Sequence, residues 1–306
     1  MSGLLLLLLI ALVLSLLLLG LMITWDTMHP PRRTAGWALG RGIDVDPADM
    51  GLSFEEWDLR VSDGSTVKAW DVMTGMSSPG PVVVLLHGWS RSRIDMLPVL
   101  ETWSRLVPRV IIMDLRGHGD AGSRTCRLGQ REVEDVLQLL QAIGTDTILV
   151  GHSLGATVAI MTAASGRSGA EHVRGVLAIA PYEGFDVPIA AKLRAKRIHP
   201  WLIMPVVMSI FRCLGIVRRS TSTHAGRLEC PLLVLQGAKD MVSPPEQSRM
   251  IADAGGGTYM QFDGGFHDQL WMVDPPGHEK ACAELLAQAR ECLRTGPTDQ
   301  PPGGSA

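Results

Sequence analysis

The sequence GHSLGA at residues 151–156 has the pattern G-x-S-x-G, with Ser153 at its centre. It directly follows the apolar run 147–150 and directly precedes a helical stretch, which is the context in which this pattern forms a sharp strand-to-helix turn. Side chains at the two flanking positions would collide in such a turn, so glycine is needed there. Ser153 is therefore a candidate nucleophile. The alternative interpretation is a glycine-rich turn with an incidental serine.

Similar apolar runs occur on both sides of this motif, and each ends in glycine, proline or polar residues; they are residues 82–86, 110–113, 176–179 and 232–235. Short runs that are apolar on both faces are typical of parallel strands covered by helices on both sides. Between them, residues 132–143 have the spacing of an amphipathic helix. The pattern predicts an α/β fold with a mostly parallel, doubly wound sheet, whose ligands bind at the carboxyl ends of the strands.

An antiparallel hairpin is expected before these runs. Residues 54–61 and 66–73 are strand-like, and the Ser-Asp-Gly-Ser sequence of residues 62–65 joins them. An Asp-Gly pair between two such segments indicates a tight turn.

A serine hydroxyl needs a base to take its proton and an acid to orient that base. The expected chain order in this architecture is serine, acid, histidine. Asp240 follows the run 232–235, and His267 follows a further expected strand, residues 258–262. We therefore assign Asp240 as the acid and His267 as the base.

Asp240 and His267 each have an alternative, non-catalytic interpretation. Asp240 would otherwise cap a helix that starts near Pro244, and His267 would otherwise be a histidine of a surface loop. Asp263 and Asp268 are ranked below Asp240, because neighbours in one loop rarely reach the far side of the imidazole ring.

Two backbone donors are expected for a developing oxyanion. One is the N–H of Leu154, next after the serine. The other is the N–H of Trp89 in the loop after the run 82–86. His87 is interpreted as a structural residue of the same loop.

Together these motifs resemble the α/β-hydrolase superfamily, and more narrowly its bacterial single-span members related to serine aminopeptidase-like and monoacylglycerol-lipase-like hydrolases. The resemblance covers about residues 52–293 and rests on HGW at 87–89, DLRGHG at 114–119, GHSLG at 151–155, GAKD at 237–240 and His267. It implies the α/β-hydrolase fold and a structural, non-catalytic role for residues 114–119. Ser153 excludes the aspartate nucleophile of the dehalogenases and epoxide hydrolases in the superfamily.

The resemblance also implies that residues 181–229 form an inserted helical cap. Residues 187–227 contain no Asp or Glu and eight Lys or Arg, and residues 200–211 are apolar. One interpretation is an element that enters the membrane interface. The simpler one, which we favour, is a cap whose apolar residues line an acyl pocket. The apolar run is short for a second membrane span.

Residues 4–25 are apolar and uncharged, and about 20 such residues cross a bilayer. A retained anchor is favoured over a cleaved signal peptide, because no positively charged start and no A-x-A site is present. Arg32 and Arg33 follow the run, which predicts a cytoplasmic domain. Five cysteines without framework spacing fit a reducing compartment.

The 306 residues are thus divided into an anchor (1–25), a tether (26–50), a hydrolase domain (51–293, with the cap at 181–229) and a disordered tail (294–306). The net charge of −3 argues against a nucleic-acid partner, and no metal or organic cofactor is expected.

The predicted function is hydrolysis of carboxylic esters, lipid-like ones above all, through an acyl-enzyme. The alternative is a peptidase or amidase with the same triad, for which Glu183 is the nearest residue to bind a free amine. The third hypothesis is a non-catalytic membrane interaction module. Such a module is expected to lack one residue of the triad.

Overall fold

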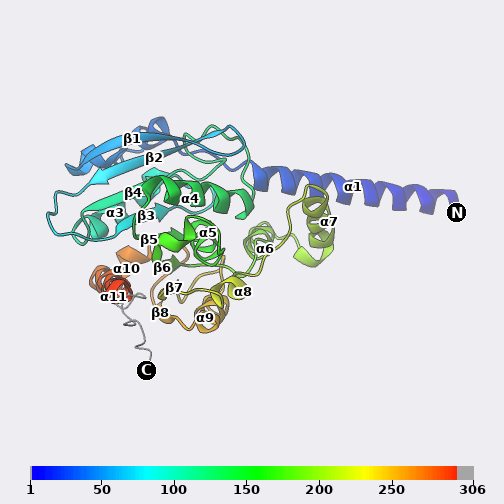
Figure 1. Cartoon of the computed structure of the whole chain (residues 1–306). Helices are drawn as coiled ribbons and strands as arrows, with labels where there is room; N and C mark the ends of the chain where they lie inside the picture. The colour runs from blue at the N-terminus through cyan, green and yellow to red at the C-terminus, as the bar shows by residue number, and fades with distance from the viewer. Residues whose placement is uncertain (1, 295–306) are drawn as a thin grey trace, which may run out of the picture.

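The computed structural model describes residues 2–294, and an eight-stranded sheet forms its centre (Figure 1). The strand order is β1-β2-β4-β3-β5-β6-β7-β8. The β1–β2 and β2–β4 pairs are antiparallel. The strands β3 to β8 form a continuous parallel set. The strands are β1 (Ser53–Arg60), β2 (Thr66–Met73), β3 (Val82–Leu86), β4 (Arg109–Met113), β5 (Thr147–His152), β6 (Val173–Ile179), β7 (Leu232–Gly237) and β8 (Thr258–Phe262). The predicted hairpin and the mostly parallel sheet are confirmed.

Helices cover both faces of the sheet, as the two-sided burial of its central strands requires. Every residue of β3, β5 and β7 is buried. One face packs against α4 (Gln130–Ile143), α5 (Leu154–Ala163) and α9 (Pro245–Ala254). The other packs against α3 (Leu97–Ser104), α10 (Leu270–Val273) and α11 (Pro275–Arg294). Three short 3₁₀ turns complete the domain: η1 (Pro47–Met50), η2 (Arg93–Met96) and η3 (Ala170–His172).

Three helices are inserted between β6 and β7, which confirms the predicted helical cap. They are α6 (Asp186–Ala195), α7 (Pro200–Cys213) and α8 (Thr221–Ala225). The inward face of α7 buries Ile203, Val207 and Phe211, and the Phe211 ring meets the edge of Phe185 with centroids 5.2 Å apart. This apolar contact fixes α7 above α6.

The N-terminal helix α1 (Ser2–Met28) projects away from the domain (Figure 1). It is long and apolar enough to cross a membrane, and by the same criteria of length and composition it also fits a signal sequence. The part of α1 around Gly20 lies against α7 of the cap.

The predicted tether lies along the surface of the domain. The Arg32 guanidinium donates to the carbonyl oxygens of Ala121 (2.8 Å) and Ser123, and Arg33 pairs with Asp95. The short helix α2 (Ala35–Leu39) fully buries Ala38. The predicted tail falls outside the described residues except for Arg294, which ends α11.

Candidate active site

Ser153 stands between β5 and α5 with backbone angles φ 53° and ψ −109°. A positive φ is unfavourable for a residue with a side chain and is kept only where the surroundings enforce it. The glycines of the motif explain how the turn closes. A Cβ atom on Gly151 would overlap the backbone of Gly155, and one on Gly155 would overlap the carbonyl oxygen of Leu86. The predicted strand-to-helix turn therefore has its steric cause in neighbouring backbone atoms.

The structure brings Ser153, His267 and Asp240 into one line of hydrogen bonds. The Nε2 atom of His267 lies 2.9 Å from Ser153 Oγ, and its Nδ1 atom lies 2.7 Å from Asp240 Oδ2. Ser153 follows β5, Asp240 follows β7 and His267 follows β8, so three loops at the carboxyl edge of the sheet supply the three side chains.

The Asp240 carboxylate is fixed by further donors. Its Oδ1 accepts hydrogen bonds from the backbone N–H groups of Val242 (2.7 Å) and Ser243 (2.8 Å), and its Oδ2 accepts one from Gln236 Nε2 (3.0 Å). Burial alone would raise the pKa of this carboxyl group. The hydrogen bond and charge of His267 and the two backbone donors outweigh burial and lower the pKa below its ordinary value. Asp240 is therefore ionised at neutral pH, and it directs the Nδ1–H of His267 toward itself.

The two predicted oxyanion donors lie beside the serine. Leu154 is the first residue of α5, and Trp89 is in the loop after β3. Among the residues described, neither backbone N–H donates a hydrogen bond to a protein acceptor. The loop approaches closely because Gly88 has no side chain; a Cβ there would lie 2.9 Å from His152 Nδ1.

His87 and the loop of residues 114–119 support this region from below. The His87 Nε2 atom accepts a hydrogen bond from the Leu115 N–H (2.9 Å), and burial lowers the pKa of His87 to about 4. Asp114 accepts from the backbone N–H groups of Arg93 (2.8 Å) and Asp120 (3.0 Å). These contacts hold the two loops in place.

A cavity of about 460 Å³ opens above Ser153 and His267. Its walls are mainly apolar and come from the cap, the loop after β3 and the loop after β7; they include Trp89, Tyr182, Phe185, Ile189 and Met241. Two further residues lie near its rim. Thr27 is at the end of α1, and its carbonyl oxygen accepts a hydrogen bond from Trp89 Nε1 (2.9 Å). Lys192 of α6 places its ammonium group 4.5 Å from the centre of the Trp89 ring.

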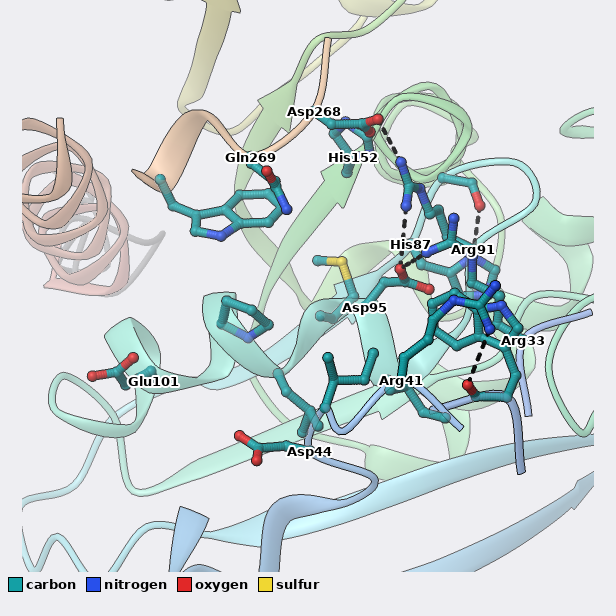
Figure 2. Close-up of a pocket in the computed structure, with 18 of the residues that line it drawn as sticks. Arg33, Arg41, Asp44, His87, Arg91, Asp95, Glu101, His152, Asp268 and Gln269 are labelled. Atoms are coloured by element: carbon teal, nitrogen blue, oxygen red, sulfur yellow. Dashed lines mark hydrogen bonds and ion pairs between the residues drawn. The ribbon is translucent and has the colours of Figure 1, made fainter. Parts of the chain in front are cut away.

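A second cavity, of about 550 Å³, lies on the other side of His152 (Figure 2). The two cavities share Gly88, Arg91, His152 and Asp268. Arg91 separates them, since it pairs with Asp268 of the histidine loop and with Asp95 (3.4 Å), which in turn pairs with Arg33. A series of ion pairs thus connects the segment after α1 to the residue next to His267.

The structure separates the other candidates from the serine. Asp263 is exposed, and Asp268 faces Arg91 and His152, where its Oδ1 atom lies 3.6 Å from His152 Nε2. The Glu183 carboxylate accepts hydrogen bonds from the N–H (2.9 Å) and the hydroxyl (3.1 Å) of Ser222 at the start of α8. No group of three or more potential metal ligands occurs within residues 2–294.

Two features of the site went unnoticed in the sequence. His152 fills a variable position of the G-x-S-x-G pattern, yet its Nε2–H donates to the backbone carbonyl oxygen of His267 (2.9 Å). Thr27 belongs to an apolar helix more than a hundred residues from the serine. Its contribution to the cavity has no local signal in the sequence.

The comparisons with known proteins agree with this fold. Residues 83–213 match the model of the alpha/beta hydrolase family. The bovine protein phosphatase methylesterase 1 is 30% identical over 133 residues, which are 41% of this chain and 35% of that protein, so the match spans about a third of that relative. The monoacylglycerol lipase of Mycolicibacterium smegmatis is 26% identical over 222 residues, which cover 60% of this chain and 79% of the lipase.

Solved structures share the fold. An esterase of Pyrococcus furiosus superposes with a TM-score of 0.69 at 18% identity, covering 85% of this chain and 97% of the esterase. A puromycin-hydrolysing peptidase of Mycobacterium tuberculosis superposes with a TM-score of 0.58 at 22% identity, covering 79% of this chain and 39% of the peptidase. The eight-stranded sheet, the serine turn after β5 and the match of residues 83–213 to the alpha/beta hydrolase family lead to one conclusion: this chain has the α/β-hydrolase fold.

Proposed function

We propose that this protein is a membrane-anchored serine hydrolase that cleaves carboxylic esters with an apolar acyl chain through an acyl-enzyme intermediate. The observation that carries the proposal is the hydrogen-bonded line from Ser153 Oγ through His267 to Asp240, with distances of 2.9 and 2.7 Å. These are the distances over which a base can take a proton from a nucleophile.

In the first half of the reaction, Ser153 Oγ attacks the ester carbonyl carbon while its proton passes to His267 Nε2. The backbone N–H groups of Leu154 and Trp89 stabilise the negative charge on the carbonyl oxygen. His267 then gives the proton to the leaving alcohol as the C–O bond breaks. In the second half, His267 takes a proton from water and the hydroxide attacks the acyl carbon; the bond from that carbon to Ser153 Oγ then breaks, the carboxylic acid leaves, and the proton returns to Oγ. Asp240 stays ionised and holds His267 in the required orientation.

The apolar walls of the cavity support the choice of acyl group. Phe185, Ile189 and Tyr182 present carbon surface beside the serine, and such surface favours a hydrocarbon chain. The similarity to a monoacylglycerol lipase is consistent with this choice. The peptidase alternative has less support, because the Glu183 carboxylate is engaged at the start of α8.

The proposed location of the protein at a membrane rests on helix α1. A helix of this length and composition fits a retained single span. Arg32 and Arg33 follow it closely, and by the positive-inside rule they favour a cytoplasmic catalytic domain.

The test compares turnover of p-nitrophenyl esters of increasing acyl length with turnover of matched p-nitroanilides, using the full chain in detergent micelles. We expect ester hydrolysis that increases from acetate to medium-chain acyl groups and is lost in Ser153→Ala. Faster cleavage of the anilides would favour an amidase. Ester turnover that survives in Ser153→Ala would contradict the mechanism.

A further inference from the structure

The N-terminal helix makes a continuous contact with the cap along one side. Residues 3–15 of α1 are exposed throughout, whereas Leu16, Leu19, Ile23 and their neighbours Gly20 and Thr24 are partly or fully buried. These positions recur every three or four residues, so they form one stripe on the helix. The stripe lies on the part of α1 that contacts α7, and Figure 1 shows α7 beside α1.

The two helices approach each other closely at Gly20. A Cβ atom at that position would lie 2.8 Å from Val206 Cγ1 and 3.1 Å from Ile210 Cδ1. Small residues that allow such close approach are typical of helix pairs inside membranes.

The length of α1 determines how deep in the bilayer its contact with α7 would lie. The uncontacted part, residues 4–15, has only 12 residues, which extend about 18 Å, whereas a bilayer has a hydrocarbon core of about 30 Å. If α1 spans the membrane, as the proposed function holds, then Leu16 to Ile23 must also lie in the hydrocarbon. Asp26 is the first charged residue of the chain, and Gly20 precedes it by about 9 Å.

We propose that α7 is immersed, packed on α1, in the hydrocarbon of the leaflet next to the domain, and that the active-site cavity opens at the headgroup level of that leaflet. The exposed face of α7 therefore contacts lipid hydrocarbon. The inference rests on the proposed span, and it makes the cap a second part of the membrane anchor.

The composition of α7 fits this surrounding. Its outward face carries Trp201 (73% exposed) and Leu202 (47% exposed), and residues 200–211 contain no charged side chain. Two hydroxyl side chains of the pair are satisfied within their own helices: Ser209 Oγ donates to the Pro205 carbonyl oxygen (2.7 Å), and Thr24 Oγ1 donates to the Gly20 carbonyl oxygen (2.8 Å). Hydrocarbon requires such internal pairing.

Charge and cavity position agree with the same depth. Basic residues cluster at both ends of α7, at the level where lipid headgroups would lie; they are Arg194, Lys196 and Arg197 before it, Arg212 in its last turn, and Arg218 and Arg219 after it. Thr27, one residue after Asp26, lines the active-site cavity. An acyl chain in this leaflet would therefore reach Ser153 without crossing bulk water.

To test this, the full chain is reconstituted in phosphatidylcholine vesicles. Some of the phosphatidylcholine molecules carry a photoreactive diazirine in the acyl chain. After photolysis, the crosslinked peptides are identified by mass spectrometry. We expect crosslinks in both α1 and α7 and none in α9. Crosslinks in α1 without any in α7 would overturn the inference and leave the anchor intact. Absence from both helices would overturn the inference together with the proposed span.

A matched pair of variants tests the consequence for substrate access. Leu202→Asp puts a charge on the exposed face of α7, and Met250→Asp puts one at a similarly exposed position (43%) of α9. We expect Leu202→Asp to lower hydrolysis of a vesicle-embedded long-chain ester about tenfold, since a charge opposes insertion in hydrocarbon. Met250→Asp is expected to have no effect. Both variants should hydrolyse a soluble acetate ester at the wild-type rate, which separates lost access from a damaged triad. Equal activity of Leu202→Asp and wild type on the vesicle-embedded ester would contradict the inference.

Discussion

The Nε2–H of His152 donates a hydrogen bond of 2.9 Å to the backbone carbonyl oxygen of His267. The residue that precedes the serine thus holds the loop that carries the proposed base. Burial lowers the pKa of His152 to about 4, so its ring is neutral at pH 7 and has one N–H to donate. The His152 side chain therefore links the serine turn to the histidine loop in addition to the Ser153–His267 hydrogen bond.

Replacing His152 should therefore affect the orientation of His267 more than the binding of substrate. We expect His152→Gln to lower kcat for a soluble ester about tenfold with KM nearly unchanged, because loss of a positioning contact misaligns the proton transfer. Steady-state kinetics measure both constants. A rise in KM at constant kcat would indicate that His152 contacts the substrate instead.

Asp240 and Asp268 provide a direct comparison of the two acids near His267. Asp240→Asn removes the charge that accepts from His267 Nδ1, and we expect kcat to fall about 1,000- to 10,000-fold. Asp268→Asn breaks a partly exposed pair with Arg91 and should lower kcat less than about tenfold. The reverse order of effects would assign the acid to Asp268.

Gly155 is expected to tolerate no side chain. In Gly155→Ala the new Cβ would overlap the Leu86 carbonyl oxygen at the end of β3, so the variant should lose several kcal/mol of folding stability, roughly as in overpacked cores. Gly36→Ala is the control, since the nearest atom to its Cβ is 3.9 Å away. Chemical denaturation of both variants checks this, and equal stability would contradict the proposed steric cause of the turn.

His278 gives a prediction for the effect of pH on stability. It is 1% exposed in α11, and burial lowers its pKa from 6.5 to about 4. The unfolded chain takes up a proton near pH 6.5, whereas the folded protein does so only near pH 4. The contribution to stability is therefore complete above pH 6.5 and is lost as the pH falls to 4. At pH 5 the loss is about 2 kcal/mol relative to pH 7.5.

The substitution His278→Leu removes this titratable group and leaves the residues around Ser153 unchanged. Its free energy of unfolding should fall less between pH 7.5 and pH 5 than that of the wild type, by about the same 2 kcal/mol. Denaturant titrations at the two pH values measure the difference. An identical pH dependence in the two proteins would mean that His278 is not buried in the neutral form.

The sequence predicted those parts of the fold that have a local cause. Strands such as β3 and β5 are buried on both faces, so they read as continuous apolar runs. The motif around Ser153 needs two glycines for steric reasons, and the loops of Asp240 and His267 follow recognisable strands. Each of these signals lies within a few residues of the feature it predicts.

The features that the sequence did not predict depend on contacts between distant segments. Arg33 and Asp95 are 62 residues apart, and Arg91 and Asp268 are 177 apart. Nothing near any of these residues indicates its partner. Gly20 likewise reads as one more small residue in an apolar helix, and its close contact with Val206 emerges only when α1 and α7 are placed together.

The central claim is that Ser153 is an activated nucleophile. The most direct measurement is covalent labelling of the full chain in detergent by a fluorophosphonate probe, with the modified peptide identified by mass spectrometry and with Ser153→Ala and His267→Ala as comparisons. We predict that the wild type is labelled on Ser153 and that labelling disappears in both variants. Absence of labelling in the folded wild type, or labelling that persists in Ser153→Ala, would contradict the proposed mechanism.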